Sequence, residues 1–267
     1  MIITGIRGHD VKAESLSKVA EKMQGEGLEY VQLVLEKSIP GFGYGQYTEE
    51  YAKEIKAMLG KTKIAVLGSY INPSNPDEEA LRYDIERFKE KIKYASTLNP
   101  IVVGTETGRY KDGETHSEEA YQRVLNTVRE LVSEAEKYGV SVGIEGVHLF
   151  VIDTPRTMKR LVDDVNSDNL KVIFDPMNYL NDDNYQNQDE MIRELFDLLH
   201  DKVVCVHVKD FKIVDGKMRS CPAGTGLLNF KLIFDKMREY GLTLPFISED
   251  LSDEDAVLMF ERLRGLL

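Results

Sequence analysis

Four short apolar runs in the second half of the chain each end in a side chain that can bind a metal ion. The runs are rich in β-branched residues, and the side chains at their ends are Glu145, Asp175, His207 and Glu249. These residues are 30, 32 and 42 positions apart, which is close to the length of one strand followed by one helix. If the four strands are parallel neighbours, all four side chains point toward one place. We therefore expect a divalent-metal site at the ends of these strands.

Neighbouring residues add charge to the same place. Side chains alternate between the two faces of a strand, so Cys205, His207 and Lys209 share one face. Three carboxylates gathered with an imidazole and an ammonium are costly unless a partner balances their charge, and a divalent cation is the simplest partner. Three oxygen ligands and one nitrogen ligand suit Mn²⁺, Mg²⁺, Zn²⁺ or Co²⁺ and do not choose between them. Each carboxylate taken singly is more often a loop cap or a salt-bridge partner, so the prediction depends on the four together.

Eight apolar runs alternate with helical patterns and would position these side chains. We expect strands at residues 2–6, 30–35, 63–67, 99–103, 140–145, 170–175, 203–208 and 244–249. We expect helices at residues 12–23, 49–59, 77–98, 117–138, 191–199, 231–240 and 253–267, and one more that begins at Thr154. Strands that alternate with helices indicate a parallel sheet. Eight such units, none with a Gly-rich phosphate-binding motif after its strand, indicate an α/β fold of the (β/α)8 TIM barrel type rather than an open sheet.

Local signals predict several of the helix boundaries. Thr48 is expected to cap the helix at residues 49–59, and Thr154 followed by Pro155 is expected to begin another helix. Gly139 is expected to end the helix at residues 117–138 in the left-handed conformation. The segment that follows the strand at residues 203–208 is expected to be a loop.

The composition indicates one globular domain that spans residues 1–267. The chain is 42% hydrophobic and 30% charged, and no linker rich in Gly, Ser or Pro divides it. Its formal net charge of -12 repels phosphate backbones, so we expect neither nucleic acid nor an anionic membrane surface as a partner. Two cysteines make no disulfide framework, and we expect no signal peptide and no membrane span. A cytoplasmic location is therefore predicted.

Around the four candidate ligands the sequence resembles a known family. Glu145 lies in Gly-Ile-Glu-Gly, Asp175 in Phe-Asp-Pro-Met-Asn, His207 in Val-His-Val-Lys-Asp and Glu249 in Ser-Glu-Asp. Together with the later segment Pro-Ala-Gly-Thr-Gly-Leu-Leu-Asn-Phe, these motifs resemble the xylose isomerase-like barrel superfamily over nearly the whole chain. That superfamily includes sugar-phosphate isomerases and epimerases, ketose 3-epimerases, inosose dehydratases and endonuclease IV-type DNA repair enzymes. The resemblance implies a xylose isomerase-like TIM barrel, one divalent metal held by the four residues, and a small-molecule carbohydrate substrate.

The chain departs from the family pattern at one position. Many members have a histidine three residues after the aspartate of the sixth strand, and here that residue is Asn178. Asparagine can still form a hydrogen bond with a substrate hydroxyl, so Asn178 remains a candidate for substrate binding. The change leaves the assignment to a particular member of the superfamily open.

The expected chemistry is proton transfer next to a carbonyl group. A metal ion acts as a Lewis acid on the carbonyl oxygen, while two carboxylates remove the proton and return it through an enediolate. The resemblance implies that Glu145 and Glu249 have this role and that Asp175 and His207 are chiefly structural ligands. Lys209 is expected to polarise a substrate oxygen or to balance the carboxylates, and an ion pair with Asp210 or Glu249 is an equal alternative.

Six further residues are candidates for contacts with the substrate. They lie at the ends of expected strands or in the loops that follow them: His9, Tyr70, Asn72, Glu106, His148 and Arg219. His148 resembles a histidine that family members often carry in the loop over the site. In such positions Glu106 is more often a salt-bridge partner, and Arg219 is more often an ordinary surface residue.

Three other functions fit the same pattern. A lyase that dehydrates a cyclitol or keto-sugar would use the same metal and base to expel a hydroxyl group. A DNA repair nuclease of the same superfamily would need several metals and a basic face, and the five histidines and the net charge of -12 argue against it. A non-catalytic sugar-binding barrel is the third. The sequence leaves open which sugar binds, whether it is phosphorylated, which metal is native and how many chains assemble.

Overall fold

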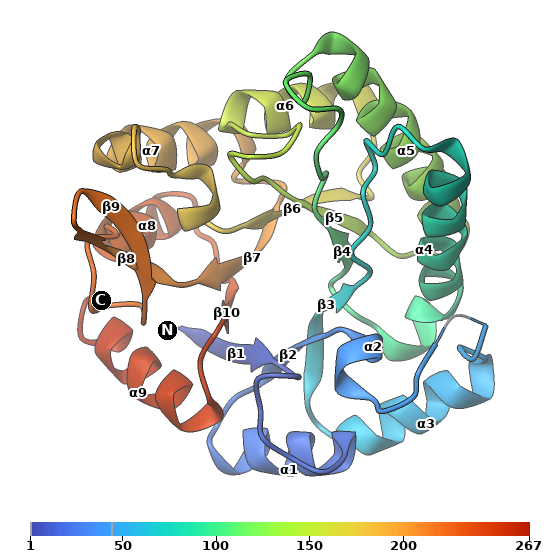
Figure 1. The fold of residues 1–267 in the computed structure, drawn as a ribbon. Helices are drawn as coiled ribbons and strands as arrows, with labels where there is room; N and C mark the ends of the chain where they lie inside the picture. The colour runs from blue at the N-terminus through green and yellow to red at the C-terminus, as the bar shows by residue number, and fades with distance from the viewer. Residues whose placement is uncertain (1, 44) are drawn as a thin grey trace.

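Eight parallel strands form a closed barrel in the order β1-β10-β7-β6-β5-β4-β3-β2. The structure is a computed structural model, and it describes residues 2–43 and 45–267. The barrel strands are β1 (Ile3–Arg7), β2 (Tyr30–Leu33), β3 (Lys63–Gly68), β4 (Val102–Thr105), β5 (Val142–Glu145), β6 (Leu170–Phe174), β7 (Val203–Val208) and β10 (Pro245–Ser248). Figure 1 looks along the barrel, with these strands at its centre.

Helices form a ring around the strands, as Figure 1 shows. They are α1 (Leu16–Gly25), α2 (Leu35–Ser38), α3 (Glu49–Leu59), α4 (Glu78–Leu98), α5 (Glu118–Lys137), α6 (Pro155–Val165), α7 (Gln188–Leu199), α8 (Phe230–Glu239) and α9 (Asp253–Arg264). Two short 3-10 helices, η1 (Met177–Tyr179) and η2 (Tyr185–Asn187), follow β6. This arrangement confirms the expected (β/α)8 TIM barrel.

The expected helix boundaries are confirmed where a capping residue marked them. The side chain of Thr48 accepts a hydrogen bond from the backbone of Tyr51 at the start of α3. The side chains of Thr154 and Thr157 form a capping box at the start of α6. Gly139 follows α5 with a φ of 65°, a conformation that glycine adopts without steric cost.

Among the boundaries that differ from the expectation, two have a clear local cause. Helix α1 begins at Leu16 rather than at residue 12, because the side chain of Ser15 caps its first turn. Asn99 ends α4 in the left-handed conformation, so β4 begins at Val102 rather than at residue 99.

The segment after β7 is a β-hairpin rather than the expected loop. Its antiparallel strands are β8 (Asp210–Val214) and β9 (Lys217–Cys221). The connecting residues Asp215 and Gly216 both have positive φ, 52° and 75°, and an Asp-Gly pair strongly favours a two-residue hairpin turn. The Asp-Gly dipeptide is the signal in the sequence from which the hairpin could have been predicted.

The interior of the barrel is filled by a small apolar cluster that comprises Ala65, Val66, Val102, Ile173, Cys205 and Ile247. Gly104 and Gly143 leave room for Ile173, because a Cβ atom on either glycine would lie only 2.8 or 3.1 Å from its Cδ1. Ile173, Cys205 and Ile247 each precede a candidate ligand by two positions. Their inward orientation therefore directs the candidate ligands toward the barrel axis, as the alternation of side chains predicted.

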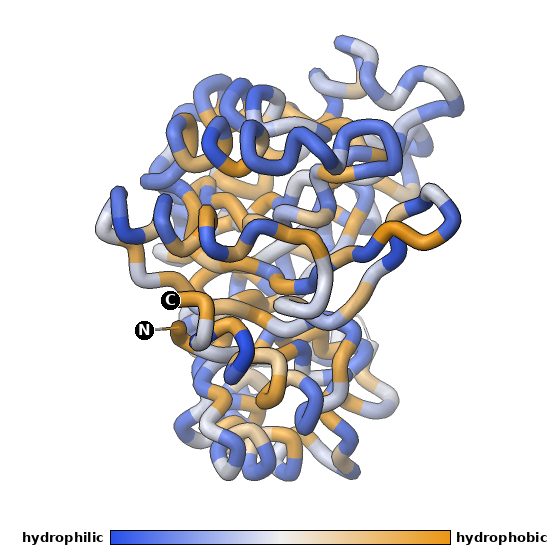
Figure 2. Tube along the Cα trace, turned by 90° about the vertical axis from the view of Figure 1, so that its left-hand side faces the viewer, coloured by the Kyte–Doolittle hydropathy of each residue, from blue (hydrophilic) through white to orange (hydrophobic). Residues whose placement is uncertain are grey.

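A larger apolar core lies between the strands and the helices. Phe88, Phe174, Phe196 and Phe246 are fully buried in it, and Figure 2 shows hydrophobic residues inside and hydrophilic residues along the outer helices. Among the described residues, no helix combines the length and the apolar character needed to cross a membrane.

Candidate active site and metal centre

A polar cavity of about 370 Å³ lies at the C-terminal ends of the barrel strands, where TIM barrels carry their active sites. Seven residues expected at the site line it: His9, Tyr70, Glu106, Glu145, Asn178, Lys209 and Glu249. Its volume falls within the range of small-molecule sites. The cavity is therefore large enough for a sugar-sized substrate.

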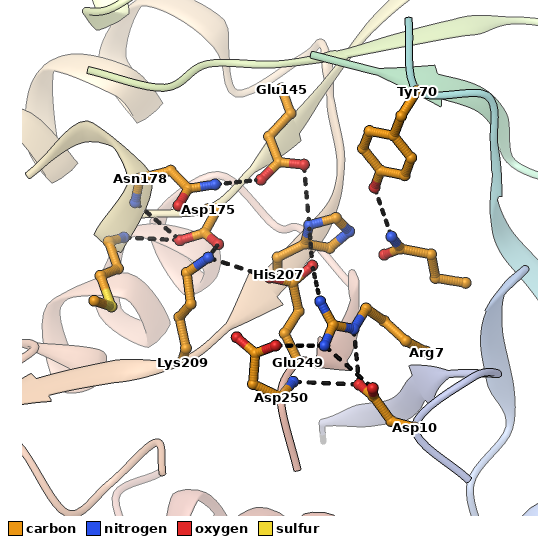
Figure 3. A network of polar contacts seen from close by, with 12 residues as sticks. Arg7, Asp10, Tyr70, Glu145, Asp175, Asn178, His207, Lys209, Glu249 and Asp250 are labelled. Atoms are coloured by element: carbon orange, nitrogen blue, oxygen red, sulfur yellow. Dashed lines mark hydrogen bonds and ion pairs between the residues drawn. The ribbon is translucent and has the colours of Figure 1, made fainter. Parts of the chain in front are cut away.

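Glu145, Asp175 and His207 converge at this cavity from the ends of β5, β6 and β7. One ligand atom from each residue lies within 4.8 Å of the ligand atoms of the other two, and Figure 3 shows the three side chains pointing toward one another. Their exposed fractions are 2%, 0% and 0%. Within the described residues, neither ring nitrogen of His207 has a hydrogen-bond partner. Nδ1 lies 3.2 Å from carboxylate oxygens of Glu145 and Glu249. A buried ring nitrogen without a hydrogen bond is nevertheless costly, and a cation at this centre would remove that cost.

The segment after β6 orients two of these ligands. The backbone N–H groups of Met177 and Asn178 donate to Oδ1 of Asp175, at 2.9 and 3.1 Å. The side chain of Asn178 donates from Nδ2 to Oε1 of Glu145 at 2.6 Å. Short hydrogen bonds of this kind fix the orientation of metal ligands. Asn178 thus contacts a candidate ligand directly, a contact that its position in the sequence did not indicate.

Glu249 lies beside this group of three, close to His207, Arg7 and Lys209. Its Oε1 is 3.2 Å from Nδ1 of His207 and 3.9 Å from Nη1 of Arg7. Its Oε2 is 3.2 Å from Nζ of Lys209, and that ammonium is also 2.9 Å from Oδ2 of Asp175. The ion-pair alternative for Lys209 is therefore realised, with Asp175 and Glu249 as its partners.

The charges at this centre shift one another's pKa values. Burial raises the pKa of Asp175 to about 6, although Lys209 opposes the shift. Burial alone would lower the pKa of His207, but the carboxylates of Glu145 and Glu249 raise it to about 9. Burial alone would raise the pKa of Glu249, but His207 and Lys209 lower it to about 2. The positive charge around Glu249 thus stabilises its ionised form, whereas burial makes Asp175 easier to protonate.

The residues present fit a divalent cation. Glu145 and Asp175 offer carboxylate oxygens, and His207 offers a ring nitrogen without a hydrogen bond in the described structure. Oxygen and nitrogen donors of these types bind Zn²⁺ and Mn²⁺, and do not choose between them. Glu249 is close enough to His207 to serve as a fourth ligand.

Three of the expected substrate contacts lie elsewhere. The side chain of Asn72 donates to the backbone oxygen of Arg109 and accepts from Ser74, so it holds neighbouring loops. His148 has its Nδ1 3.1 Å from the backbone oxygen of Asn178 and does not line the cavity. Arg219 is exposed on β9, which also lies outside the cavity lining.

Four polar residues line the cavity that sequence reasoning did not select: Arg7, Gln32, Lys37 and Asp250. Gln32 did leave a signal, because it is the one polar residue within the apolar run Val31–Leu35 of the sequence. Arg7 follows the expected first strand directly, and Asp250 follows Glu249. Lys37 lies on the short helix α2, whose presence the sequence pattern did not predict.

Asp210 closes the base of the hairpin. Its carboxylate accepts backbone hydrogen bonds from Phe211, Gly224, Gly226 and Leu228. It is 1% exposed. The aspartate of the His-x-Lys-Asp element is therefore a structural residue that fixes the chain next to Lys209.

A family model described as "Xylose isomerase-like TIM barrel" matches residues 20–264. The chain belongs to this family. The chain is similar in sequence to the uncharacterized protein MJ1311 of Methanocaldococcus jannaschii, with 27% identity over 203 residues. That match covers 74% of this chain and 67% of the relative.

Solved structures share the family fold over almost the full chain. A D-tagatose 3-epimerase-like protein has a TM-score of 0.77 and 23% identity, covering 99% of this chain and 97% of that one. The IOLI protein with a binding zinc atom has a TM-score of 0.75 and 17% identity, covering 99% and 96%. The probable 3-DHS dehydratase AsbF from Bacillus anthracis has a TM-score of 0.74 and 17% identity, covering 100% and 98%. At these identities the similarity shows the fold that the family shares.

Proposed function

We propose that this family member is a divalent-metal-dependent isomerase or epimerase of a sugar or sugar phosphate. The observation that carries the proposal is the convergence of Glu145, Asp175 and His207, with Glu249 beside them, at a polar cavity. The zinc atom in the IOLI structure and the epimerase-like neighbour support it. A divalent cation held by these four residues would supply Lewis-acid polarisation of the substrate carbonyl.

Glu145 is the proposed base. Its Oε2 lies 3.2 Å from Nδ1 of His207, which leaves Oε1, hydrogen-bonded by Asn178, as the atom that takes the proton. The proton comes from the carbon next to the substrate carbonyl. The electron pair of that C–H bond forms the C=C bond of an enediolate, whose negative charge lies on the former carbonyl oxygen.

Glu249 is the proposed acid that returns a proton from the other side. Lys209 lies 3.2 Å from its Oε2 and stabilises the carboxylate that remains after the transfer. Since its neighbours lower the pKa of Glu249 to about 2, Glu249 is ionised at neutral pH. It therefore takes from solvent the proton that it delivers to the enediolate, and Glu145 releases its own proton to solvent to complete the cycle. The stereochemical outcome then depends on which face of the enediolate receives the proton.

The test is incorporation of solvent deuterium into the substrate. The purified protein is stripped with a chelator, reloaded separately with Mn²⁺, Mg²⁺, Zn²⁺ or Co²⁺, and its metal content is measured. A panel of ketoses, ketose phosphates and keto-inositols is then incubated with each form in D2O and analysed by NMR. We expect deuterium at the carbon next to the carbonyl in at least one compound, only with the reloaded protein. Absence of exchange across the panel in protein with a full metal complement contradicts the proposal.

Dehydration is a second candidate, and Glu106 favours it. Burial and the nearby carboxylates of Glu145 and Glu249 raise the pKa of Glu106 to about 7, so it can hold a proton at neutral pH. It lines the cavity and could protonate a leaving hydroxyl group after Glu145 removes the carbon-bound proton. The probable dehydratase among the similar structures supports this reading. Mass spectrometry of the same panel distinguishes the two reactions, because dehydration removes one water molecule from the substrate whereas isomerisation and epimerisation leave its mass unchanged.

A further inference from the structure

One side of the cavity carries polar atoms without partners. This side, which we call the β1–β3 side, comprises His9, Gln32, Lys37 and Tyr70 at the ends of the first three strands and on α2. Gln32 is 1% exposed and donates from Nε2 to the hydroxyl of Tyr70 at 2.6 Å, a contact drawn in Figure 3. Its Oε1 has no hydrogen-bond partner among the described residues. A buried amide oxygen left unpaired is costly, so this atom is available to a ligand hydroxyl.

Helix α2 holds Lys37 in a fixed place at the cavity. Leu35 is fully buried, and the carboxylate of Glu36 lies 2.6 Å from Nζ of Lys91 and 3.3 Å from Nη2 of Arg87 on α4. Lys37, the next residue, is exposed and lines the cavity. Because both preceding residues are anchored, the backbone of Lys37 is fixed while its side chain is free to reach a ligand.

His9 lies next to Lys37 on the same side. Burial lowers the pKa of His9, and the charges of Arg7 and Lys37 lower it further, although Asp10 opposes them. Nδ1 of His9 is buried and has no hydrogen-bond partner in the described part of the chain. The neutral imidazole therefore offers a second polar group beside the ammonium of Lys37.

The other cations of the cavity already have acidic partners. Arg7 pairs with Asp10 at 2.7 Å and with Asp250 at 2.5 Å. Lys209 pairs with Asp175 and Glu249 in the same way.

Lys37, by contrast, forms no ion pair with any residue that the structure describes. A cation that no carboxylate neutralises, in a concave polar site, attracts an anionic group of the ligand.

We propose that Lys37 and His9 form a subsite for a terminal phosphate or carboxylate of the substrate, with Gln32 and Tyr70 binding a neighbouring hydroxyl group. The inference rests on the proposed function, and it narrows the substrate from sugars in general to anionic sugar derivatives. A phosphate monoester and a carboxylate offer the same chemistry to this subsite, namely acceptor oxygens that carry negative charge.

The test measures binding rather than turnover, so that it does not depend on the proposed reaction. Isothermal titration calorimetry with the metal-loaded protein compares D-fructose, D-fructose 6-phosphate and D-fructuronate as probes. We expect the preferred anionic probe to bind at least tenfold more tightly than D-fructose, as charge-assisted hydrogen bonds allow. We expect that preference to weaken as the salt concentration rises. A stronger response to the phosphate ester indicates a sugar phosphate substrate, and a stronger response to the uronate indicates a sugar acid.

Variants assign the preference to the subsite. The preference is expressed as the dissociation constant of D-fructose divided by that of the preferred anionic probe. In Lys37→Met this ratio should fall about tenfold, and in Lys37→Arg most of the preference should be retained. Lys217→Met is the matched control, because it removes the same charge from an exposed position on β9, outside the cavity lining. Its ratio should equal that of the unmodified protein. Circular dichroism checks that each variant is folded.

Equal affinity for charged and neutral probes, no measurable binding of either anion at millimolar concentration, or an unchanged ratio in Lys37→Met overturns the inference. Failure of the proposed function looks different. In that case solvent deuterium does not enter any substrate, while the anionic preference and its dependence on Lys37 persist.

Discussion

The two sides of the cavity mouth differ in how their polar atoms are satisfied. On the side formed by β5, β6, β7 and β10, the side chains of Glu145, Asp175, His207 and Glu249 lie within ion-pair distance of one another or of Lys209. The atoms there that lack a hydrogen bond among the described residues, the ring nitrogens of His207 and Oδ2 of Asp175, therefore belong to a group of opposite charges. On the β1–β3 side, Gln32, His9 and Lys37 leave polar atoms without partners within the described chain. A group that must hold a cation and move protons works best when neighbouring contacts fix it beforehand. A group that recognises substrate needs an open hydrogen-bonding position, and the contrast separates these two roles.

The largest effect is expected from Glu145→Gln on the metal-binding side. Glutamine keeps the shape of the side chain but cannot take a proton, so deuterium exchange should fall by about 100- to 10,000-fold. Glu54→Gln on the exposed face of α3 is the control and should change neither exchange nor stability. Exchange in Glu145→Gln within threefold of the unmodified rate, about 0.7 kcal/mol by the usual conversion, would falsify the assignment of the base.

A smaller loss is expected from Asn178→Ala. This change removes the 2.6 Å hydrogen bond to Glu145 and leaves the ligands themselves in place, so metal affinity should fall by roughly 10- to 100-fold. Titration with a chelating indicator measures it. Asn187→Ala, at an exposed position without a side-chain capping bond in the structure described, is the matched control. Equal metal affinity in both variants would show that Asn178 does not orient Glu145.

Gly146→Ala tests how closely η1 packs against the end of β5. A Cβ atom on Gly146 would overlap the phenol of Tyr179, the last residue of η1. We expect a loss of about 1–3 kcal/mol in the free energy of unfolding, as for overpacked cores. Gly25→Ala at the end of α1 meets no atom within 4 Å and should be neutral or stabilising. The melting temperature of Gly146→Ala should therefore fall while that of Gly25→Ala does not, and equal shifts would refute the packing argument.

The smallest effect is expected on the β1–β3 side, from Tyr70→Phe. The change removes the hydroxyl that accepts from Gln32, and one hydrogen bond contributes about 1 kcal/mol net. The KM of the active compound should rise by about fivefold while kcat changes little. If kcat falls by a larger factor than KM rises, Tyr70 acts in catalysis rather than in substrate binding. The two sides of the cavity would then not differ in role.

The sequence predicted the barrel and the residues that converge in it, because both depend on periodic patterns. Alternating strands and helices indicated the fold, and the period of two along each strand placed Asp175, His207 and Glu249 on the inner face. Residues in irregular segments could not be placed in this way. The side chain of Asn72 donates to the backbone oxygen of Arg109 and accepts from the backbone of Ser74. No periodic pattern indicates these contacts.

Lys37 shows the other limit of sequence reasoning. It reaches the cavity because α2 is anchored through Glu36 to Lys91 and Arg87, which lie about fifty positions later in the chain. Contacts between residues so distant in the chain follow from the folded structure and have no local signature. Arg219 illustrates the reverse case, since its expected loop is a hairpin that leads away from the cavity lining.

The hydrogen bonds to Asp210 fix the base of the hairpin independently of its turn. Four backbone amides at its base converge on one carboxylate, whereas the turn at Asp215 and Gly216 is exposed. An epitope tag or fluorophore-bearing peptide inserted at that turn would extend away from the closed base. The turn is thus a natural place to immobilise or label this enzyme candidate for single-molecule work without disturbing the barrel.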